Sequence, residues 1–111
     1  MTDKIIILMK TTAGELITGT LLNVNYEFVG DRISVTDDEI VLENPHIIFF
    51  DDKRQLGMAP YLPLFGSSSL PFNKLAVDVY GLVNDQVYQS YMHSISGLEL
   101  PTQPKLILEN N

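Results

Sequence analysis

The chain has 111 residues, of which 45% are hydrophobic, and its 14 acidic and 7 basic residues give a formal net charge of −7. This length predicts one domain with enough buried surface to form a core. The acidic balance disfavours charge-driven binding to phosphate backbones or anionic lipid. The lack of cysteine excludes a disulfide framework and a thiolate metal site, and it suits a reducing cytoplasm. The apolar run at 5–9 is too short for a signal peptide or a membrane span.

The first part of the chain predicts two strands joined by a tight turn. Residues 4–10 are rich in β-branched side chains and predict a strand buried on both faces. Gly14 supplies the positive φ of a hairpin turn, and residues 15–28 predict a long second strand. Gly19 lies inside that strand, where glycine typically marks a bulge or a sharp bend. We therefore expect the sheet to curve tightly at Gly19.

Further strand segments follow, separated by polar turns and by prolines. They are predicted at 32–35, 39–44, 46–50, 58–65 and 74–83. Residues 29–38 as a whole either extend the first hairpin or form a loop around the short strand. Pro60 and Pro63 confine their segment to a sheet edge or an extended interfacial position, because proline cannot donate to a ladder. Residues 66–69, with one glycine and three serines, predict a flexible loop.

The periodicity then changes to that of a helix. Apolar side chains recur at every fourth position, at Val83, Val87, Tyr91 and Ile95. The pattern predicts an amphipathic helix at about 84–96, with Asn84 as its N-cap and Gly97 as its C-cap. An extended tail at 98–111 contains two prolines and a short apolar run at 106–108 that can add to a sheet edge.

Together these elements predict a mainly β protein: a strongly bent five-stranded antiparallel sheet, or small open barrel, with one late α-helix. The high apolar content of so small a protein predicts that another copy covers part of its surface. Head-to-tail pairing of sheet edges closes into a ring when the rotation between copies allows it.

Residues 6–28 also resemble the first motif of the Sm-like family, a strand, a turn glycine and a second glycine five residues later. The matching positions are Gly14, Gly19, Leu21, Val24 and Asn25. Residues 77–83 resemble the second motif, in which Val79 and Gly81 match while Tyr80 stands where arginine is expected. The whole layout is similar to small Sm-like proteins of marine phages, including cyanophages.

The resemblance implies a homo-oligomeric ring of about five to seven subunits. It also implies that single-stranded RNA binds at the pore, through the loops after the second and fourth strands. Carried onto this chain, the nucleic-acid-binding positions are Asn25, Tyr26, Glu27, Tyr80 and Gly81. An amide can bind a base edge and an aromatic ring can stack on a base. The alternative for these residues is structural, with an asparagine turn at a strand end and tyrosines packed across strands.

The segment interrupted by prolines is our candidate subunit interface. Since it cannot lie in a central ladder, part of it is expected to face a neighbouring subunit. The residues that we expect at this interface are Tyr61, Leu62, Leu64 and Phe65.

Other polar groups suggest no further site. The acidic runs at 37–39 and 51–52 are typical of turns, and the basic pair Lys53 and Arg54 is a weak phosphate patch. His46 and His93 are too far apart in sequence to indicate a metal site, so we expect neither metal nor cofactor. No nucleophile has an evident base, so we do not expect an enzyme.

Two functions remain open. The first is a non-catalytic Sm-like ring that binds single-stranded RNA or DNA in nucleic-acid processing, as the resemblance implies. The alternative is a protein–protein adaptor or structural phage ring, favoured by the net charge of −7 and by Tyr80 in place of arginine. In either case we expect a cytoplasmic protein, in the host cell if it is phage-encoded, with no membrane partner.

Overall fold

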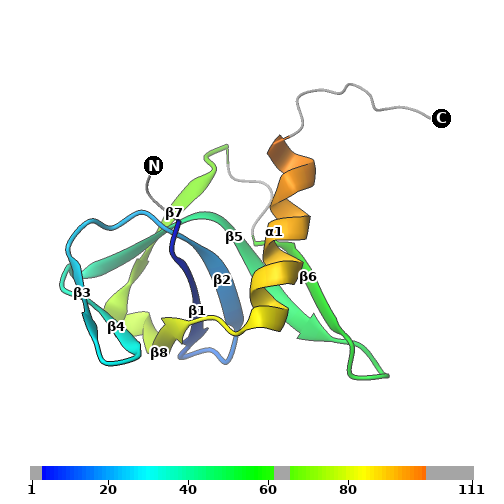
Figure 1. The fold of residues 1–111 in the computed structure, drawn as a ribbon, viewed down its shortest axis with the longest axis horizontal. Helices are drawn as coiled ribbons and strands as arrows, with labels where there is room; N and C mark the ends of the chain where they lie inside the picture. The colour runs from blue at the N-terminus through cyan, green and yellow to red at the C-terminus, as the bar shows by residue number, and fades with distance from the viewer. Residues whose placement is uncertain (1–3, 62–65, 100–111) are drawn as a thin grey trace.

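The computed structural model describes residues 4–61 and 66–99, which form a mainly β structure with one α-helix (Figure 1). The described strands are β1 (Ile6–Thr11), β2 (Leu16–Leu21), β3 (Tyr26–Val29), β4 (Arg32–Val35), β5 (Glu39–Phe50), β6 (Leu56–Pro60), β7 (Ser69–Asn73) and β8 (Val77–Leu82). A 3₁₀ turn, η1 (Lys74–Ala76), precedes β8, and the helix α1 (Asp85–Glu99) follows it. The prediction of a mainly β chain with one late helix is confirmed.

The strands pair antiparallel throughout. The larger sheet has the order β6-β5-β2-β1-β8, β7 also pairs with β5, and β3 and β4 form a separate hairpin. Because β2 pairs with β5 and β3 pairs with β4, the two pairs are successive parts of one long interrupted hairpin. β6 and β7 likewise pair with different stretches of β5. The described strands outnumber the five that we predicted, because residues 15–28 are divided into β2 and β3 and because β7 was not predicted.

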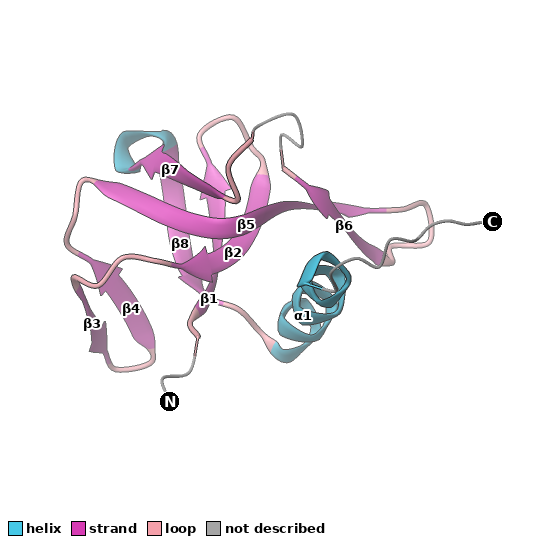
Figure 2. Cartoon of the chain, turned by 90° about the horizontal axis from the view of Figure 1, so that it is seen from above, coloured by secondary structure: helices cyan, strands magenta, loops and turns pink. Residues whose placement is uncertain are grey.

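The sheet curves but does not close into a barrel within the described residues. β5 sweeps across the molecule and carries β6 at one end and β7 at the other (Figure 2). β4 and β8 contact each other without ladder pairing. We call this unpaired junction the β4–β8 seam.

Gly19 lies at a β-bulge, as predicted. The register between β2 and β5 shifts between Thr18 and Thr20, opposite Asn44, whose φ is 51°. A Cβ atom at Gly19 would lie 2.9 Å from the Cβ of Leu42 and 3.3 Å from the carbonyl oxygen of Glu43. The glycine therefore permits both the irregular ladder and the close approach of β5.

β1 is buried on both faces, as its sequence predicts, because its alternate residues serve two apolar clusters. Ile7 is completely buried in the main core, whereas Ile6, which is 3% exposed, packs beneath α1. The other buried residues of the main core come from β1, β2, β4 and β5: Met9, Ile17, Leu21, Ile33, Val35, Ile40 and Leu42.

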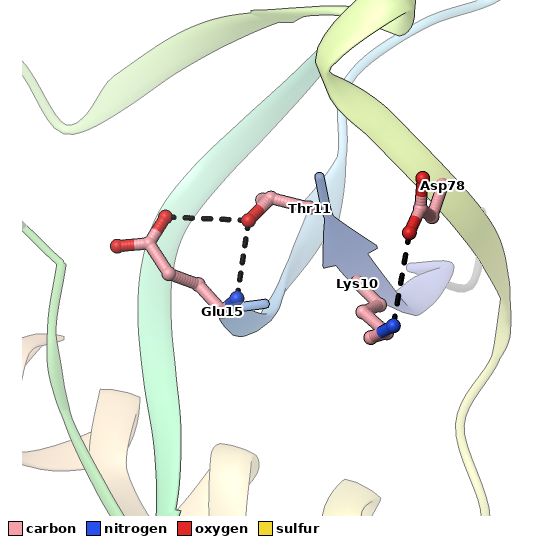
Figure 3. A network of polar contacts seen from close by, with 4 residues as sticks. All are labelled: Lys10, Thr11, Glu15 and Asp78. Carbon is pink, nitrogen blue, oxygen red and sulfur yellow. Dashed lines mark hydrogen bonds and ion pairs between the residues drawn. The ribbon is translucent and has the colours of Figure 1, made fainter. Parts of the chain in front are cut away.

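The turn between β1 and β2 is closed by side-chain bonds as well as by Gly14, whose φ is 89° (Figure 3). The Glu15 backbone N–H donates to Thr11 Oγ1 at 3.1 Å, and the Gly14 N–H donates to the Thr11 carbonyl at 2.9 Å. Beside this turn, Lys10 Nζ lies 3.7 Å from Asp78 Oδ2, and both side chains are about half exposed. This ion pair links β1 to β8 across the ladder.

The sequence did not reveal β7. We predicted a flexible loop that included Ser69, yet Ser69 pairs with Glu43 and Pro71 pairs with Val41. Pro71 is tolerated because β7 lies at a sheet edge, where a missing donor costs no ladder bond. Pro45, which we expected at an edge or bulge between two strand segments, does lie at the bulge opposite Gly19. The two segments are nevertheless one strand, since β5 continues through Pro45.

α1 begins where it was predicted to begin but ends later. Asn84 is the N-cap, with its Oδ1 accepting from the Val87 N–H at 2.9 Å. The helix runs through Gly97 to Glu99, so Gly97 is not the C-cap and the predicted tail does not begin at 98. One glycine costs about 1 kcal/mol relative to alanine, which does not by itself end a helix. The rest of the predicted tail, 100–111, lies outside the described residues.

Tyr91 anchors α1 to the sheet beside the bulge. It is completely buried, and its hydroxyl donates to the Glu43 carbonyl at 2.8 Å and lies 3.0 Å from Thr20 Oγ1. The buried His46 ring meets the Tyr91 ring edge-on, with centroids 5.5 Å apart, and its Nδ1 lies 2.8 Å from the Asn44 carbonyl oxygen. His46 is therefore part of the packing beneath the helix.

Candidate nucleic-acid interface

The predicted nucleic-acid-binding residues fall into two groups on different strands. Asn25, Tyr26 and Glu27 lie at the start of β3, and Tyr80 and Gly81 lie in the middle of β8. The two groups meet at Val35 of β4, which pairs with Tyr26 and bonds to Tyr80. The two groups therefore lie on either side of β4 and do not line a single loop.

The Asn25 side chain is engaged within the chain. Its Nδ2 donates to Asp37 Oδ1 at 3.0 Å, and Asn23 Nδ2 donates to the other carboxylate oxygen at 2.8 Å. These bonds, that of Asn23 first and then that of Asn25, lower the pKa of the Asp37 carboxyl below its usual value of 3.8. Asn23 also accepts from the Val41 N–H at 2.7 Å. The amide–carboxylate cluster thus fixes the crossing from β2 to β3.

Tyr26 and Glu27 differ in exposure. Tyr26 is half-buried against the main core, and its ring meets that of Phe28 edge-on at a centroid distance of 5.7 Å. Glu27 is exposed and pairs with Ser34 in the hairpin. Phe28, which sequence reasoning did not single out, is 55% exposed and offers more ring surface for stacking than Tyr26 does.

Tyr80 and Lys74 bridge the β4–β8 seam through side chains. The Val35 N–H donates to the Tyr80 hydroxyl at 2.9 Å, and Lys74 Nζ donates to the Val35 carbonyl at 2.7 Å. Both main-chain groups of Val35 are thereby satisfied without a ladder partner on the side that faces away from β3. Next to Tyr80, Gly81 faces open space, since a Cβ atom there would meet nothing within 4 Å.

Beside these two bridges the seam opens into a groove of about 580 Å³, which we call the β4–β8 groove. One wall comes from the β3–β4 hairpin and the other from η1 and β8. It is lined by Val29, Arg32, Ile33, Ser34, Lys74, Val77, Asp78, Val79 and Tyr80.

The charges of the β4–β8 groove are mixed but include two cations. The Arg32 side chain has no ion pair or hydrogen bond within the described part of the chain. Lys74 is held at Val35, and Asp78 faces Lys10 at 3.7 Å. Sequence reasoning missed Arg32 and Lys74 because they are far apart in sequence and only the folding of the hairpin against β8 brings them together.

Only one member of the predicted subunit interface can be placed. Tyr61 is half-buried, packs against Phe72 at a centroid distance of 5.8 Å, and donates its hydroxyl to Glu15 Oε1 at 3.2 Å. Burial, and then the nearby Glu15 carboxylate, raises the pKa of the Tyr61 hydroxyl above 10.0. Leu62, Leu64 and Phe65 lie outside the described residues.

Neither a metal-binding cluster nor a membrane-spanning helix is present among the described residues. No group of three or more histidine or acidic residues is placed to hold a metal ion within 4–61 and 66–99. Over the same residues, no helix has the length and apolar character needed to cross a membrane.

In comparisons with known proteins, no family model and no curated protein matches the chain. The Sm-like resemblance therefore rests on the sequence motifs quoted above.

Proposed function

We propose that the chain is a non-catalytic Sm-like protein that assembles into a homo-oligomeric ring and binds single-stranded RNA, or DNA, in the β4–β8 groove. The observation that carries this proposal is the convergence of Arg32 and Lys74 with Tyr80 in one groove of about 580 Å³. The order of the strands is compatible with the resemblance. The main path of the larger sheet, β6-β5-β2-β1-β8, has five strands and ends in two sheet edges.

Assembly is supported by the two ends of the larger sheet. β6 and β7 pair only with β5, and β8 pairs only with β1, among the described strands. Val79 and Leu82 of β8 are 59% and 44% exposed, so this edge also presents apolar surface. Unpaired edges of this kind favour strand addition, and a head-to-tail contact between unlike edges generates a ring when it closes.

Nucleic-acid binding is supported by the chemistry of the groove. Arg32 offers a guanidinium for a phosphate, while Val29 and Val79 offer apolar surface for bases. A single strand suits the site better than a duplex, since bases must be unstacked to reach apolar walls. Because the net charge is −7, the chain as a whole does not attract the phosphates of RNA. The binding energy must therefore come from contacts within the β4–β8 groove.

A protein–protein adaptor is the second candidate, and the same groove supports it. β4 and β8 each present one edge without ladder pairing, and such edges accept extended peptides. Asp78 in the groove and the overall acidity oppose an anionic ligand. An adaptor would use the backbone of the groove rather than its cations.

Fluorescence anisotropy with labelled U-rich and A-rich single-stranded RNA distinguishes the two candidates. We expect binding at low salt, weakened about tenfold by Arg32→Glu, because a phosphate contact is replaced by repulsion. Lys53→Glu is the matched control, since it makes the same charge change in the exposed turn between β5 and β6. We expect the control to bind RNA nearly as well as the natural chain.

The outcome that contradicts nucleic-acid binding is equally definite. If assembled protein binds neither RNA at low salt, nucleic-acid binding is contradicted and the adaptor is favoured. If both charge reversals weaken binding equally, RNA binds elsewhere and the β4–β8 groove is not the site.

A further inference from the structure

Two neighbouring phenylalanines are exposed where β5 ends. Phe49 and Phe50 are 49% and 57% exposed, and by strand alternation their rings lie on opposite faces of the β5–β6 hairpin. The Phe49 ring lies over Gly57 of β6, where a Cβ atom would collide with it. Phe50 lies on the face of the sheet that carries α1, since it alternates with His46, which packs against Tyr91. The Phe50 ring, the more exposed of the two, is thus available to contact another surface.

The turn that follows Phe50 is held by hydrogen bonds. Asp51 Oδ1 accepts from the Lys53 and Gln55 N–H groups, both at 2.8 Å, and the Asp51 N–H donates to the Gln55 carbonyl at 3.0 Å. In both ribbon views this turn lies at the right-hand end of the described strands, away from β8 (Figure 1, Figure 2). The hairpin therefore presents Phe50 at a fixed position on one side of the molecule.

An apolar groove lies on the same face of the sheet but near its opposite edge, and we call it the β1–β8 groove. It has a volume of about 330 Å³ and is lined mainly by Leu8, Lys10, Leu16, Val79, Gly81 and Leu82. Leu8 lies between Ile7 and Met9 of the main core, so its side chain shares the other face with Ile6, which packs beneath α1. A Cβ atom at Gly81 would meet nothing within 4 Å, which leaves room for a ring.

The hairpin and the β1–β8 groove are complementary, and one chain cannot join its own two surfaces. Val79 and Leu82 of the groove are 59% and 44% exposed, so apolar surface remains for Phe50 to cover. Lys10 in the groove and the exposed Asp52 in the turn have opposite charges. Because β6 and β8 lie at opposite edges of the larger sheet, the two surfaces can meet only between copies. Such a contact joins unlike surfaces, and repetition of it closes a ring when the rotation allows.

We propose that Phe50 of one copy docks in the β1–β8 groove of the next copy, over Gly81, with Asp52 beside Lys10. The inference rests on the ring of the proposed function, for which it names a side-chain contact between subunits, and it does not depend on RNA binding. A buried aromatic ring in an apolar pocket is the kind of contact that dominates the energy of an interface.

Sedimentation velocity of the full chain tests this contact with two variants. Phe50→Asp removes the ring and adds a charge, while Gly81→Leu fills the groove at a position where its Cβ meets nothing in its own chain. We expect each change to weaken self-association at least about tenfold. Leu75→Asp is the control, because it adds the same charge in η1 at a position that is 90% exposed. The control should assemble as the natural chain does.

Mixing the two variants shows whether the contact joins unlike surfaces. Phe50→Asp keeps an intact groove and Gly81→Leu keeps an intact ring, so one sound contact remains for each pair of chains. We expect a one-to-one complex that grows no further. If the natural chain assembles and both variants assemble equally well, or if the mixture forms no complex, the Phe50 contact is wrong although the ring stands. A natural chain that stays monomeric would overturn the ring and the contact together.

Engineered cysteines locate the contact independently and leave Phe50 in place. The chain has no natural cysteine to interfere. We expect the pair Asp52→Cys and Lys10→Cys to form disulfides between chains at least about tenfold faster than Asp52→Cys with Leu75→Cys, because docking raises the effective concentration. Equal rates for the two pairs, or a disulfide formed within one chain, would contradict the docking.

Discussion

Two tyrosines bond to the backbone at irregular points of the sheet, and their surroundings differ. Tyr91 is completely buried under α1, where its hydroxyl reaches the Glu43 carbonyl at 2.8 Å. Tyr80 is half-buried at the β4–β8 seam, where its hydroxyl accepts from the Val35 N–H at 2.9 Å. The bond beneath the helix completes a packed interface, whereas the bond at the seam leaves a groove open beside it. One kind of contact therefore completes a packed interface in one region and borders an open groove in the other.

The largest expected effect comes from removing the ring under the helix. Tyr91→Ala deletes a fully buried aromatic side chain and should lower the free energy of unfolding by about 3–5 kcal/mol. Tyr80→Ala should cost clearly less, because the Tyr80 ring borders solvent. Urea unfolding of both variants measures the difference. Equal losses would show that the seam is as tightly packed as the helix interface.

A smaller effect is expected at the bulge that supports the helix. Gly19→Ala places a Cβ atom 2.9 Å from the Cβ of Leu42, so β5 must shift. We expect a loss of about 1–3 kcal/mol in the free energy of unfolding. Gly81→Ala is the control, because a Cβ atom there meets nothing within 4 Å. Its stability should stay within about 0.5 kcal/mol of the natural chain.

Removing only the hydroxyls sharpens the comparison between the two tyrosines. Tyr91→Phe removes the donor from the part-buried bond to the Glu43 carbonyl and should cost about 1–3 kcal/mol. Tyr80→Phe should cost less, about 0.5–1.5 kcal/mol, because water in the open groove can reach the Val35 N–H. Thermal or urea unfolding gives both values. A larger loss of stability for Tyr80→Phe would show that the Val35–Tyr80 bond stabilises the fold more than the Tyr91–Glu43 bond does.

The smallest effect concerns the half-buried Asp37 and depends on pH. Since Asn23 and Asn25 lower the pKa of Asp37, its ionised form stabilises the fold above the usual value of 3.8, and this stabilisation is lost as the pH falls through the lowered pKa. Asp37→Ala should therefore be less stable than the natural chain at pH 7, with the difference disappearing in acid. Urea midpoints measured across this range check the sign. A difference that grows in acid would contradict it.

Local signals in the sequence predicted the local features well. Gly19 marked a real bulge, and Asn84 marked the real start of α1. Both predictions depend on neighbouring residues alone. Gly97 failed because the packing of Val87, Tyr91 and Ile95 stabilises a helix beyond what one glycine can interrupt.

The candidate site was less predictable because it depends on topology. Arg32 and Lys74 belong to different hairpins, and the groove that joins them exists only because β8 pairs with β1 and lies against β4. β7 was missed for a related reason: Pro71 argues against a strand until the edge position that tolerates it is known.

The salt dependence of RNA binding tests the central claim most directly, that cations of the β4–β8 groove contact phosphates. For single strands the slope of log affinity against log salt is about −0.7 per neutralised phosphate. We predict that Arg32→Ala makes the slope less steep by about 0.7, while Lys53→Ala leaves it unchanged. An unchanged slope in Arg32→Ala, or no RNA binding at any salt, would contradict the account.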